Sequence, residues 1–575
     1  MMDKRAAAFT LEQIASFMEL KGENTFRVRA FVTAARVLRG LPADLQESLQ
    51  DGSLAAARGI GPATLQIINE LVSTGRSSML EELREQIPAG LVEMLSVPGL
   101  SVTRIRQIHE TLGIDSLPEL EAAARDGRLS ALPRFGPKTA ENLLKSIAFL
   151  RQTTGLRLSH NAFEEANALK ADLERLPGVR EVIIAGEVRR RAEVVRDIVL
   201  VLVAGVTPEE VFKRLRALPG INEFAGQDER TVTLRFAGGS SAQIVVTTAV
   251  NTGAVLVQAT GSEDHLAQLA AHASGRGYAL SGAALWRGSV FVPTPDESAF
   301  YSALGLELIP PELREGRGEI EAAAAGIIPR LIERKDLQGL LHCHTTYSDG
   351  TNSVEELARA CQAAGYSYAG ITDHSVSAAY AGGLTPDDLR RQADEIDEVN
   401  QRLTGIRVLK GIEADILADG RVDYDEATLS ALDFVIASIH SRFNMNEAEM
   451  TTRMLTAMDN SLVSIIGHPT GRLLLARNPY PVDLDAVLDK AAERGIAMEM
   501  NADPHRLDLD WRFLQKAREK GVMISIGADA HSIPTLRHVD NGLGIARKGW
   551  LRKEDVINTR PVDQFLSIVG KRVNR

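Results

Sequence analysis

LQGLLHCHTTYSDG, residues 337–350, places two histidines and an aspartate directly after a short apolar run. Six further runs follow: YSYAGITDH, IRVLKGIEAD, LDFVIASIH, VSIIGH, GIAMEMNAD and GVMISIGADAH. Short, continuous apolar runs are typical of buried parallel strands, and amphipathic patterns such as SVEELARACQAAG and DLDAVLDKAAERG lie between them. The C-terminal half is therefore predicted to be a (β/α) barrel, in which the C-terminal strand ends converge on one rim.

Metal-binding side chains follow nearly all of these runs, and we expect them to meet at that rim: His342, His344, Asp349, His374, Glu413, His440, His468, Asp529 and His531. A lone buried histidine is more often a hydrogen-bonded core residue than a ligand. However, six of the 12 histidines fall at strand ends together with Asp or Glu. In HCH, His342 and His344 point to the same side of a strand, while Cys343 points away and is expected to be a core residue.

Mixed imidazole and carboxylate ligands suit Zn, Mn or Fe, and clustered ions of this kind activate water and clamp the oxygens of a phosphodiester. Phosphoester hydrolysis is therefore the predicted reaction. Arg442, Arg472 and Arg506 lie just beyond ligand motifs. Each guanidinium could grip a phosphate oxygen, or could be a solvated loop charge.

Composition narrows the class of protein. A chain of 575 residues should hold several domains, and 44% hydrophobic residues with a mean hydropathy of −0.07 indicate a globular protein without a membrane span. Two cysteines, Cys343 and Cys361, exclude a disulfide framework, so we expect a reducing cytoplasm. We also expect a monomer. The net charge of −11 argues against DNA binding by bulk electrostatics.

Local sequence motifs in the N-terminal third could bind DNA instead. RGIGPATLQII (58–68), VPGLSVTRI (97–105) and RFGPKTAENLL (134–144) are tight glycine turns that lead into helices, whose N-termini attract anions. Together they resemble helix-hairpin-helix motifs, although Ser101 stands where the middle copy should have a second glycine. The predicted DNA contacts are Gly59, Gly61, Gly99, Gly136 and Lys138. We expect bulky residues at Gly61 and Gly136 to distort the turns, because a β-carbon disfavours positive φ.

The C-terminal motifs HCHTTYSDG, ITDHS, GIEADI, SIHSRFN, IGHPTGR and GADAHS resemble those of the PHP metal-dependent phosphoesterases. The resemblance implies two or three divalent ions. His342, His344, Glu413 and Asp529 would hold one ion. Glu413 would bridge to a second ion held by His440 and His468, and the third would be held by Asp349, His374 and His531.

The rest of the chain resembles the family X DNA polymerases, on GENTFRVRAF (22–31), AARVLRG (34–40), TGSEDHLAQLA (260–270) and IPPELREGRGEIEAA (309–323). The resemblance implies a palm that binds Mg or Mn and a nucleoside triphosphate. In AGEVRRRAEVVRDIVLVLVA (185–204), Arg189, Arg190 and Asp197 match the family pattern.

Three palm positions depart from the family pattern: Glu187 replaces a serine, and Val199 and Gln243 stand at the second and third aspartates. Polymerase activity is therefore expected to be weak or lost, because two-metal phosphoryl transfer needs negative oxygens. The alternative is that Glu187 or Glu193 substitutes as a ligand and supports Mn-dependent gap filling.

We predict five segments: a helical DNA-binding domain (1–80), a fingers-like helical domain (81–155), a degenerate nucleotidyltransferase palm (156–240), a thumb (241–318) and a PHP domain (335–575). The predicted function is a DNA-repair 3′–5′ exonuclease acting on gapped or nicked DNA through the PHP metals, with Arg506 and the palm residues Arg190 and Asp197 as further catalytic candidates. A mainly non-catalytic binder of DNA gaps is the alternative. A small-molecule phosphatase is disfavoured by the attached DNA-binding segments.

Overall fold

The computed structural model describes residues 4–39, 41, 45–218, 221–236 and 241–570. It divides into two compact units, residues 1–155 and residues 156–575, which we describe separately. Within the described parts of both units, no helix is long and apolar enough to cross a membrane.

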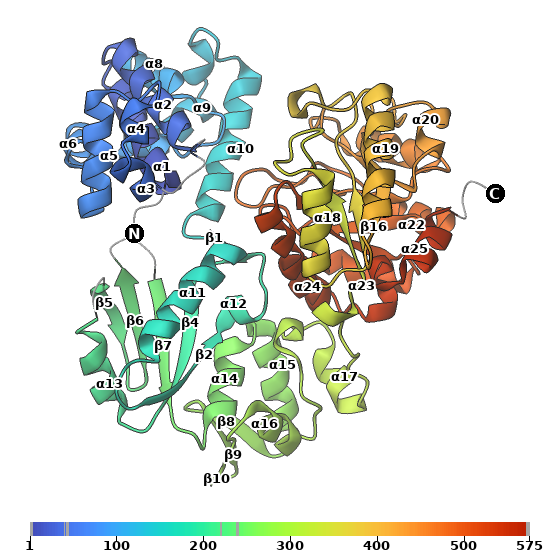
Figure 1. The fold of residues 1–575 in the computed structure, drawn as a ribbon. Coiled ribbons are helices and arrows are strands. Elements are labelled where there is room, and N and C mark those ends of the chain that lie inside the picture. Colours follow the sequence, from blue (N-terminus) through green and yellow to red (C-terminus); the bar gives the residue numbers. More distant parts are fainter. Residues whose placement is uncertain (1–3, 40, 42–44, 219–220, 237–240, 571–575) are drawn as a thin grey trace. The chain divides into compact units, whose positions relative to one another are not determined.

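The described part of the first unit is built from helices alone (Figure 1). They are α1 (Lys4–Leu20), α2 (Thr25–Arg39), α3 (Leu45–Gln50), α4 (Ser53–Ala56), α5 (Pro62–Thr74), α6 (Ser78–Gln86), α7 (Ala89–Met94), α8 (Val102–Leu112), α9 (Leu117–Arg125) and α10 (Pro137–Thr153). Because α1 packs against α2, α6 and α8, one apolar core containing Leu11, Phe31 and Ile108 runs through the unit. The predicted helical N-terminal region is confirmed, while the division near residue 80 stays a prediction.

The predicted palm (156–240) forms most of a five-stranded mixed sheet with the order β2-β4-β7-β6-β5, whose strand β7 lies within the residues predicted as thumb (241–318). Its strands are β2 (Val179–Ala185), β4 (Ile198–Ala204), β5 (Ile221–Gln227), β6 (Thr231–Phe236) and β7 (Ser241–Thr247). β4 is antiparallel to β2 and parallel to β7, and α11 (Ser159–Leu173) packs against β2 and β4. The remaining elements are β1 (Arg157–Leu158), β3 (Val194–Val195), α12 (Gly186–Arg189) and α13 (Pro208–Leu215).

The predicted thumb combines helices with a small antiparallel sheet, β10-β9-β8. Its elements are α14 (Thr252–Thr260), α15 (Glu263–Ser274), β8 (Tyr278–Ser281), β9 (Ala284–Arg287), β10 (Val290–Val292) and α16 (Glu297–Ala303). Helix α17 (Glu319–Ala325) begins directly after the predicted end of the thumb at residue 318. Its buried core includes Leu269, Phe300 and Tyr301.

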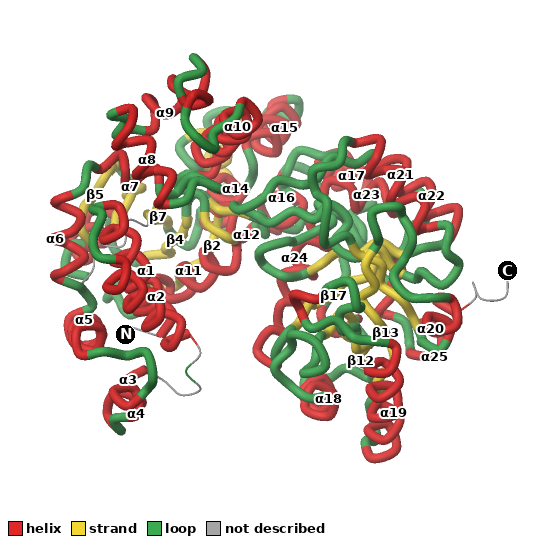
Figure 2. Tube along the Cα trace, turned by 90° about the horizontal axis from the view of Figure 1, so that it is seen from above, coloured by secondary structure: helices red, strands yellow, loops and turns green. Residues whose placement is uncertain are grey.

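The C-terminal part is a closed barrel of seven parallel strands, and Figure 2 shows these strands surrounded by helices. The strands are β11 (Gly339–Cys343), β12 (Tyr368–Ile371), β13 (Arg407–Asp415), β14 (Phe434–Ser438), β15 (Ile465–Ile466), β16 (Ala497–Asn501) and β17 (Ile524–Ala530). The helices are α18 (Val354–Ala363), α19 (Pro386–Arg402), α20 (Glu426–Ser430), α21 (Glu447–Met458), α22 (Leu484–Arg494), α23 (Trp511–Glu519), α24 (Val539–Lys548) and α25 (Val562–Gly570).

The seven apolar runs of the sequence are the seven barrel strands, so the predicted barrel is confirmed. Every residue of β11, β12, β14, β16 and β17 is buried, because helices cover the outside of the barrel and side chains fill its interior. The covering helices have local start signals as well. At α18, Ser353 accepts a hydrogen bond from the amide of Glu356, and Glu356 accepts one from the amide of Ser353.

Candidate functional site

All nine predicted metal ligands lie on one rim of the barrel, at or just beyond the C-terminal ends of its strands. The ligand atoms of all but His468 form three overlapping groups, within each of which the atoms lie within 4.8 Å of one another. The groups are His344, Asp349, His374 and His531; His342, His344 and Asp529; and His374, Glu413 and His440. His344 and His374 each belong to two groups, whereas the resemblance implied Glu413 as the ligand shared between ions.

Glu413 is the centre of this cluster. Its Oε1 lies 2.9 Å from Nε2 of His468 and 3.3 Å from Nε2 of His440. The same oxygen lies 3.4 Å from Nε2 of His342, and Oε2 lies 3.0 Å from Nδ1 of His374. A carboxylate reached from both oxygens by histidines on different strands has the geometry of a bridging ligand.

Asp529 and Asp349 are the other two carboxylates of the cluster. Oδ1 of Asp529 lies 3.4 Å from Nε2 of His344 and 3.7 Å from Nε2 of His342. Oδ1 of Asp349 lies 3.4 Å from Nε2 of His531 and 3.7 Å from Nδ1 of His344. His342 and His344 thus reach the same carboxylate, as the HCH spacing predicts, although β11 is bulged between Leu340 and Cys343.

The backbone at the rim is strained. His342, His468 and Asp529 have φ values of 62°, 26° and 48°, in a region that residues other than glycine rarely adopt. Such strain persists only where the surrounding structure enforces it, and it is concentrated at functional sites. Here it turns three strand-end side chains toward the common centre.

The buried nitrogens of the cluster test whether these residues fit a metal. His342 and His344 are fully buried, yet Nε2 of His342 and both ring nitrogens of His344 have no hydrogen-bond partner within the described residues. The nearest carboxylate oxygens lie 3.4 Å from the two Nε2 atoms and 3.7 Å from Nδ1 of His344. A buried nitrogen without a partner costs roughly 1–3 kcal/mol, so the arrangement fits metal coordination better than a hydrogen-bonded core.

The electrostatics agree with that fit. Burial alone would raise the pKa of Glu413, but His440, His342 and His374 outweigh burial and hold its pKa well below the ordinary value. The pKa of Asp529 is likewise held well below its ordinary value by neighbours that include His342, although burial opposes this. Both groups are therefore carboxylates at neutral pH and available as ligands.

A cavity of 440 Å³ lies in the palm and is lined by residues including Asp197, Val199 and Gln243. Val199 and Gln243 are neighbours across β4 and β7. The three positions that correspond to the expected metal ligands therefore share one cavity, and only Asp197 carries a charge there. Glu187 and Glu263 also line this cavity, and Glu263 is a residue that the sequence reasoning did not consider.

Comparison with known proteins follows the same division of the chain. Family models match a helix-hairpin-helix domain over residues 2–77, a SAM-like helix-hairpin-helix tandem over 91–148, the DNA polymerase beta thumb over 255–315 and the PHP domain over 341–503. A Bacillus subtilis protein named DNA polymerase/3′-5′ exonuclease PolX is 38% identical over 573 residues, covering 98% of this chain and 99% of that protein. The chain belongs to the family X DNA polymerases that carry a C-terminal PHP domain.

Proteins named as probable phosphatases are similar to shorter parts of the chain. A probable phosphatase of Caldanaerobacter subterraneus is 38% identical over 107 residues, which are 18% of this chain and 40% of that protein. Another, from Clostridium acetobutylicum, is 33% identical over 167 residues, or 28% of this chain and 63% of that protein. As a family X polymerase with helix-hairpin-helix and thumb domains, the chain is a DNA-binding protein with a metal-dependent PHP domain.

Two carboxylates that support the PHP histidines were missed in the sequence. Oε1 of Glu499 on β16 lies 2.5 Å from Nδ1 of His342, and its Oε2 accepts a hydrogen bond from the amide of His468. Oδ1 of Asp415 lies 2.5 Å from Nδ1 of His440. Partners of this kind fix which ring nitrogen faces a metal. The available signal was a lone charge within the apolar run GIAMEMNAD, and an aspartate two residues beyond Glu413.

The three arginines proposed as phosphate contacts have different environments. Arg506 lines a cavity of 380 Å³ that contains much of the metal cluster, and its Nε lies 3.3 Å from Oδ2 of Asp529. Arg442 is exposed. For Arg472 the interpretation as a phosphate contact is wrong, because this side chain is buried and bonds to Asp510 and to the backbone carbonyls of Arg506 and Leu507.

The charged palm residues are largely engaged in contacts with other residues. Arg189 forms a two-pronged ion pair with Glu297, with distances of 2.8 and 2.6 Å. Nε of Arg190 lies 3.0 Å from Oε1 of Glu315, and its Nη1 donates to the carbonyl of Thr260. Both guanidiniums therefore have partners other than a triphosphate.

The two glutamates considered as substitute palm ligands also have structural partners. Glu187 lines the palm cavity, and its Oε2 accepts a hydrogen bond of 2.6 Å from the amide of Arg196. Glu193 is 8% exposed and accepts hydrogen bonds from Arg472, Trp511 and Arg512 of the PHP domain. Glu193 thus points to the PHP domain, which makes its use as a palm metal ligand wrong.

The glycine turns lie where predicted, directly before α5, α8 and α10. Gly61 and Gly136 are N-caps without a side-chain cap, so the first amides of α5 and α10 lack a side-chain acceptor there. Ser101 caps α8 itself, accepting a hydrogen bond from the amide of Arg104. The middle turn therefore has fewer free backbone amides with which to bind an anion. Lys138, in the first turn of α10, is exposed.

One expectation about these turns is wrong. Gly61 and Gly136 have φ values of −101° and −80°, and a β-carbon at either would have open space around it. Positive φ occurs instead at Gly59 and Gly99, with values of 106° and 80°. Only at Gly59 would a β-carbon also collide, at 2.9 Å from Cγ2 of Thr33.

Proposed function

We propose that the chain is a DNA-repair exonuclease that hydrolyses phosphodiesters from the 3′ end at its PHP metal centre, with polymerase activity weak or lost. One observation carries the proposal: among the described residues, all three groups of converging metal-binding atoms belong to the PHP domain. The 3′–5′ polarity rests on the name of the Bacillus subtilis relative.

The residues of the PHP rim support phosphodiester hydrolysis. Bound divalent ions would supply an activated water and neutralise charge on the phosphate oxygens. Glu413 would bridge ions held by the surrounding histidines, while Glu499 and Asp415 hold His342 and His440 in the tautomers that present Nε2 inward. Arg506, which lines the same cavity, is positioned to donate to a non-bridging phosphate oxygen.

The palm supports nucleotide addition poorly. At the two positions where further aspartates are expected it has the isopropyl group of Val199 and the neutral amide of Gln243, which cannot neutralise two Mg²⁺ ions as carboxylates do. The guanidiniums of Arg189 and Arg190 are paired with Glu297 and Glu315. Binding a triphosphate would require breaking those pairs.

The N-terminal unit would deliver the DNA. Uncapped helix N-termini after Gly61 and Gly136 offer backbone N–H groups to phosphates, which suits binding along a sugar–phosphate backbone without sequence preference. Gapped or nicked DNA is the proposed substrate, because the chain also carries the thumb of a gap-filling polymerase family.

The test compares nuclease and primer-extension activity on one gapped substrate. We expect Glu413→Ala to lower the exonuclease rate by about 100-fold or more, because loss of even an outer partner of a metal ligand costs roughly 10–100-fold. DNA affinity should stay unchanged. Asp197→Ala is the matched control and should leave the exonuclease intact. Full nuclease activity in Glu413→Ala would contradict the proposal.

One alternative has a specific observation in its favour. Glu187 and Glu263 line the palm cavity beside Asp197, so three carboxylates could together hold Mn²⁺ for weak gap filling. Primer extension that is supported by Mn²⁺ and abolished by Asp197→Ala would establish this second activity. A protein that binds gapped DNA but neither cleaves nor extends it would instead be a binding protein.

A further inference from the structure

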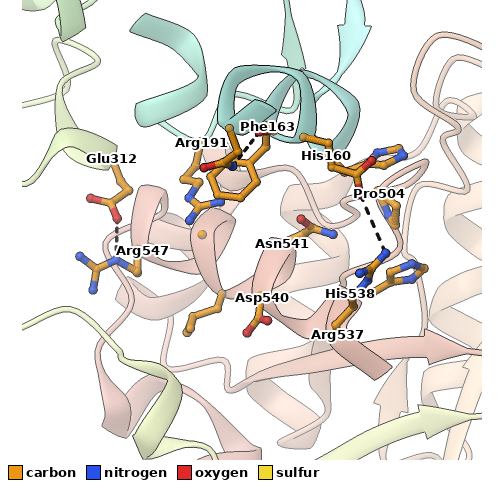
Figure 3. Close-up of a pocket in the computed structure, with 14 residues that line it drawn as sticks. His160, Phe163, Arg191, Glu312, Pro504, Arg537, His538, Asp540, Asn541 and Arg547 are labelled. Carbon is orange, nitrogen blue, oxygen red and sulfur yellow. Dashed lines mark hydrogen bonds and ion pairs between the residues drawn. The ribbon is translucent and has the colours of Figure 1, made fainter. Parts of the chain in front are cut away.

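A cavity of 690 Å³ separate from both metal-binding regions lies between the palm and the PHP domain, within the second compact unit (Figure 3). His160 and Phe163 on α11, together with Arg191, line it from the palm side. His538 and Asn541, in the segment that follows β17, line it from the PHP side. A volume of this size accommodates a nucleotide.

The cavity adjoins the metal centre through one short loop. Pro504 lines this cavity, while its neighbours Asp503, His505 and Arg506 line the cavity of the metal cluster. The rings of His160 and His505 lie 5.6 Å apart, edge to face. A strand whose terminal diester lies at the metals could therefore place a preceding nucleotide here.

The carboxylates of the lining already have partners. Oε1 of Glu312 lies 2.7 Å from Nε of Arg547. Asp540 pairs with Arg334 at 3.3 Å, and Glu164 pairs with Arg537 at 3.9 Å. Arg537 and Arg547 are therefore paired, whereas the guanidinium of Arg191 lines the cavity without a carboxylate partner among the described residues.

Arg191 and Phe163 offer the groups that a nucleotide needs. The Arg191 guanidinium lies 5.0 Å from the centre of the Phe163 ring, and Phe163 is 38% exposed. Arg191 passes over Gly544 of α24, where a β-carbon would lie 3.0 Å from its Cδ, so the helix leaves room for it. A ring face stacks on any base, and a guanidinium beside it can bind the adjoining phosphate.

Polar side chains add hydrogen-bonding groups to this surface. His160, Asn167, His538 and Asn541 line the cavity. Imidazole and amide groups can donate to and accept from the edges of a base.

We propose that this cavity binds a nucleotide of the single DNA strand whose 3′ end occupies the PHP metal centre. The inference rests on the proposed exonuclease function. A strand nucleotide fits better than a free mononucleotide, because a diester carries one negative charge and a monoester carries about two. The lining provides one unpaired guanidinium.

The test separates this cavity from the metal centre by substrate size. Phe163→Leu and Arg191→Gln are assayed on a single-stranded oligonucleotide and on bis(p-nitrophenyl) phosphate, a diester too small to reach beyond the metals. We expect KM for the oligonucleotide to rise about fivefold or more in each variant, as for loss of one stacking contact. Hydrolysis of the small diester should stay unchanged.

Arg216→Gln is the matched control, because Arg216 lies 4.9 Å from the ring of Phe224 elsewhere on the palm. Unchanged KM for the oligonucleotide in both variants would overturn the proposal, as would an equal loss on both substrates, which would indicate a general effect on the metal centre. Failure of the unaltered protein to hydrolyse either substrate would refute the exonuclease function itself.

Discussion

Replacing Glu193 with alanine should loosen the junction between the palm and the PHP domain. Glu193 is 8% exposed, and its carboxylate lies among three donors of the PHP domain. Nε1 of Trp511 donates to Oε2 over 3.1 Å, and Arg472 and Arg512 approach Oε1 at 3.5 and 3.4 Å. One substitution therefore removes the shared acceptor of all three.

The cost can be worked out contact by contact. The indole N–H of Trp511 would be left without an acceptor in a buried position, at roughly 1–3 kcal/mol. Arg512 is 47% exposed, so solvent screening limits its loss to about 1 kcal/mol or less. Arg472 keeps its ion pair with Asp510 at 2.7 Å and its two backbone acceptors, so the loss of its contact with Glu193 costs little free energy. The free energy of unfolding should fall by about 1–4 kcal/mol.

The same change should also affect the nuclease. Nε of Arg472 donates to the carbonyl of Arg506 over 2.9 Å, and Arg472 bonds to the carbonyl of Leu507 as well. Glu193 therefore steadies the backbone from which Arg506 reaches the metal cavity. If this coupling matters, Glu193→Ala should lower activity in the parent but not in an Arg506→Ala background.

Urea unfolding followed by tryptophan fluorescence would measure the stability, because Trp511 is one of three tryptophans and lies at the junction. Glu209→Ala, at an exposed position of α13, is the matched control. Equal unfolding curves for the Glu193 and Glu209 variants would refute the role assigned to the junction. Equal losses of activity from Glu193→Ala in both Arg506 backgrounds would refute the coupling.

Three further predictions concern the palm, the glycine turns and the thumb. Val199→Asp with Gln243→Asp should raise Mg²⁺-dependent primer extension on gapped DNA; no gain would show that lost carboxylates are not the defect. Gly59→Val should weaken DNA binding at least several-fold by filtration or anisotropy, because φ there is 106°, whereas Gly61→Ala should not; equal affinities would exclude that turn. Burial would raise the pKa of Glu297, but Arg189 and Arg314 hold this pKa below its ordinary value of 4.5. The Glu297 carboxylate therefore stabilises the folded protein fully above pH 4.5, and this contribution is lost as pH falls through the lowered pKa. Glu297→Gln should therefore reduce the slope with which the free energy of unfolding falls with pH below pH 4.5, and an unchanged slope would contradict this role.

The barrel was predictable because its signal is local. A parallel strand that is covered by helices on the outside and packed within reads as one short apolar run, and seven runs became seven strands. The convergence of the nine candidate ligands follows from the same topology, since residues at the C-terminal ends of different strands become neighbours.

Pairings between distant segments were not predictable. Arg472 follows a ligand motif, which is also where a phosphate-binding arginine would stand, yet its partner Glu193 is 279 residues earlier in the chain. Sequence pattern alone does not decide between an exposed loop charge, a substrate contact and a buried ion pair. The glycine turns show the limit at a smaller scale, because the motif locates the turn but does not tell which glycine has positive φ.

The palm keeps its fold without the charges of a two-metal site, and electrostatics explains why this is stable. Closely placed carboxylates repel one another unless cations lie between them, so a valine and an amide remove a source of strain from the ends of β4 and β7. Val199 also packs directly beneath Gly186, where a β-carbon would lie 2.8 Å from its Cγ2. The charged residues around that site instead hold the structure together: Arg189 binds Glu297 of the thumb, Arg190 binds Glu315, and Glu193 binds the PHP domain. In the proposed exonuclease such a palm would serve as a scaffold, and restoring its aspartates would exchange some of this stability for metal binding.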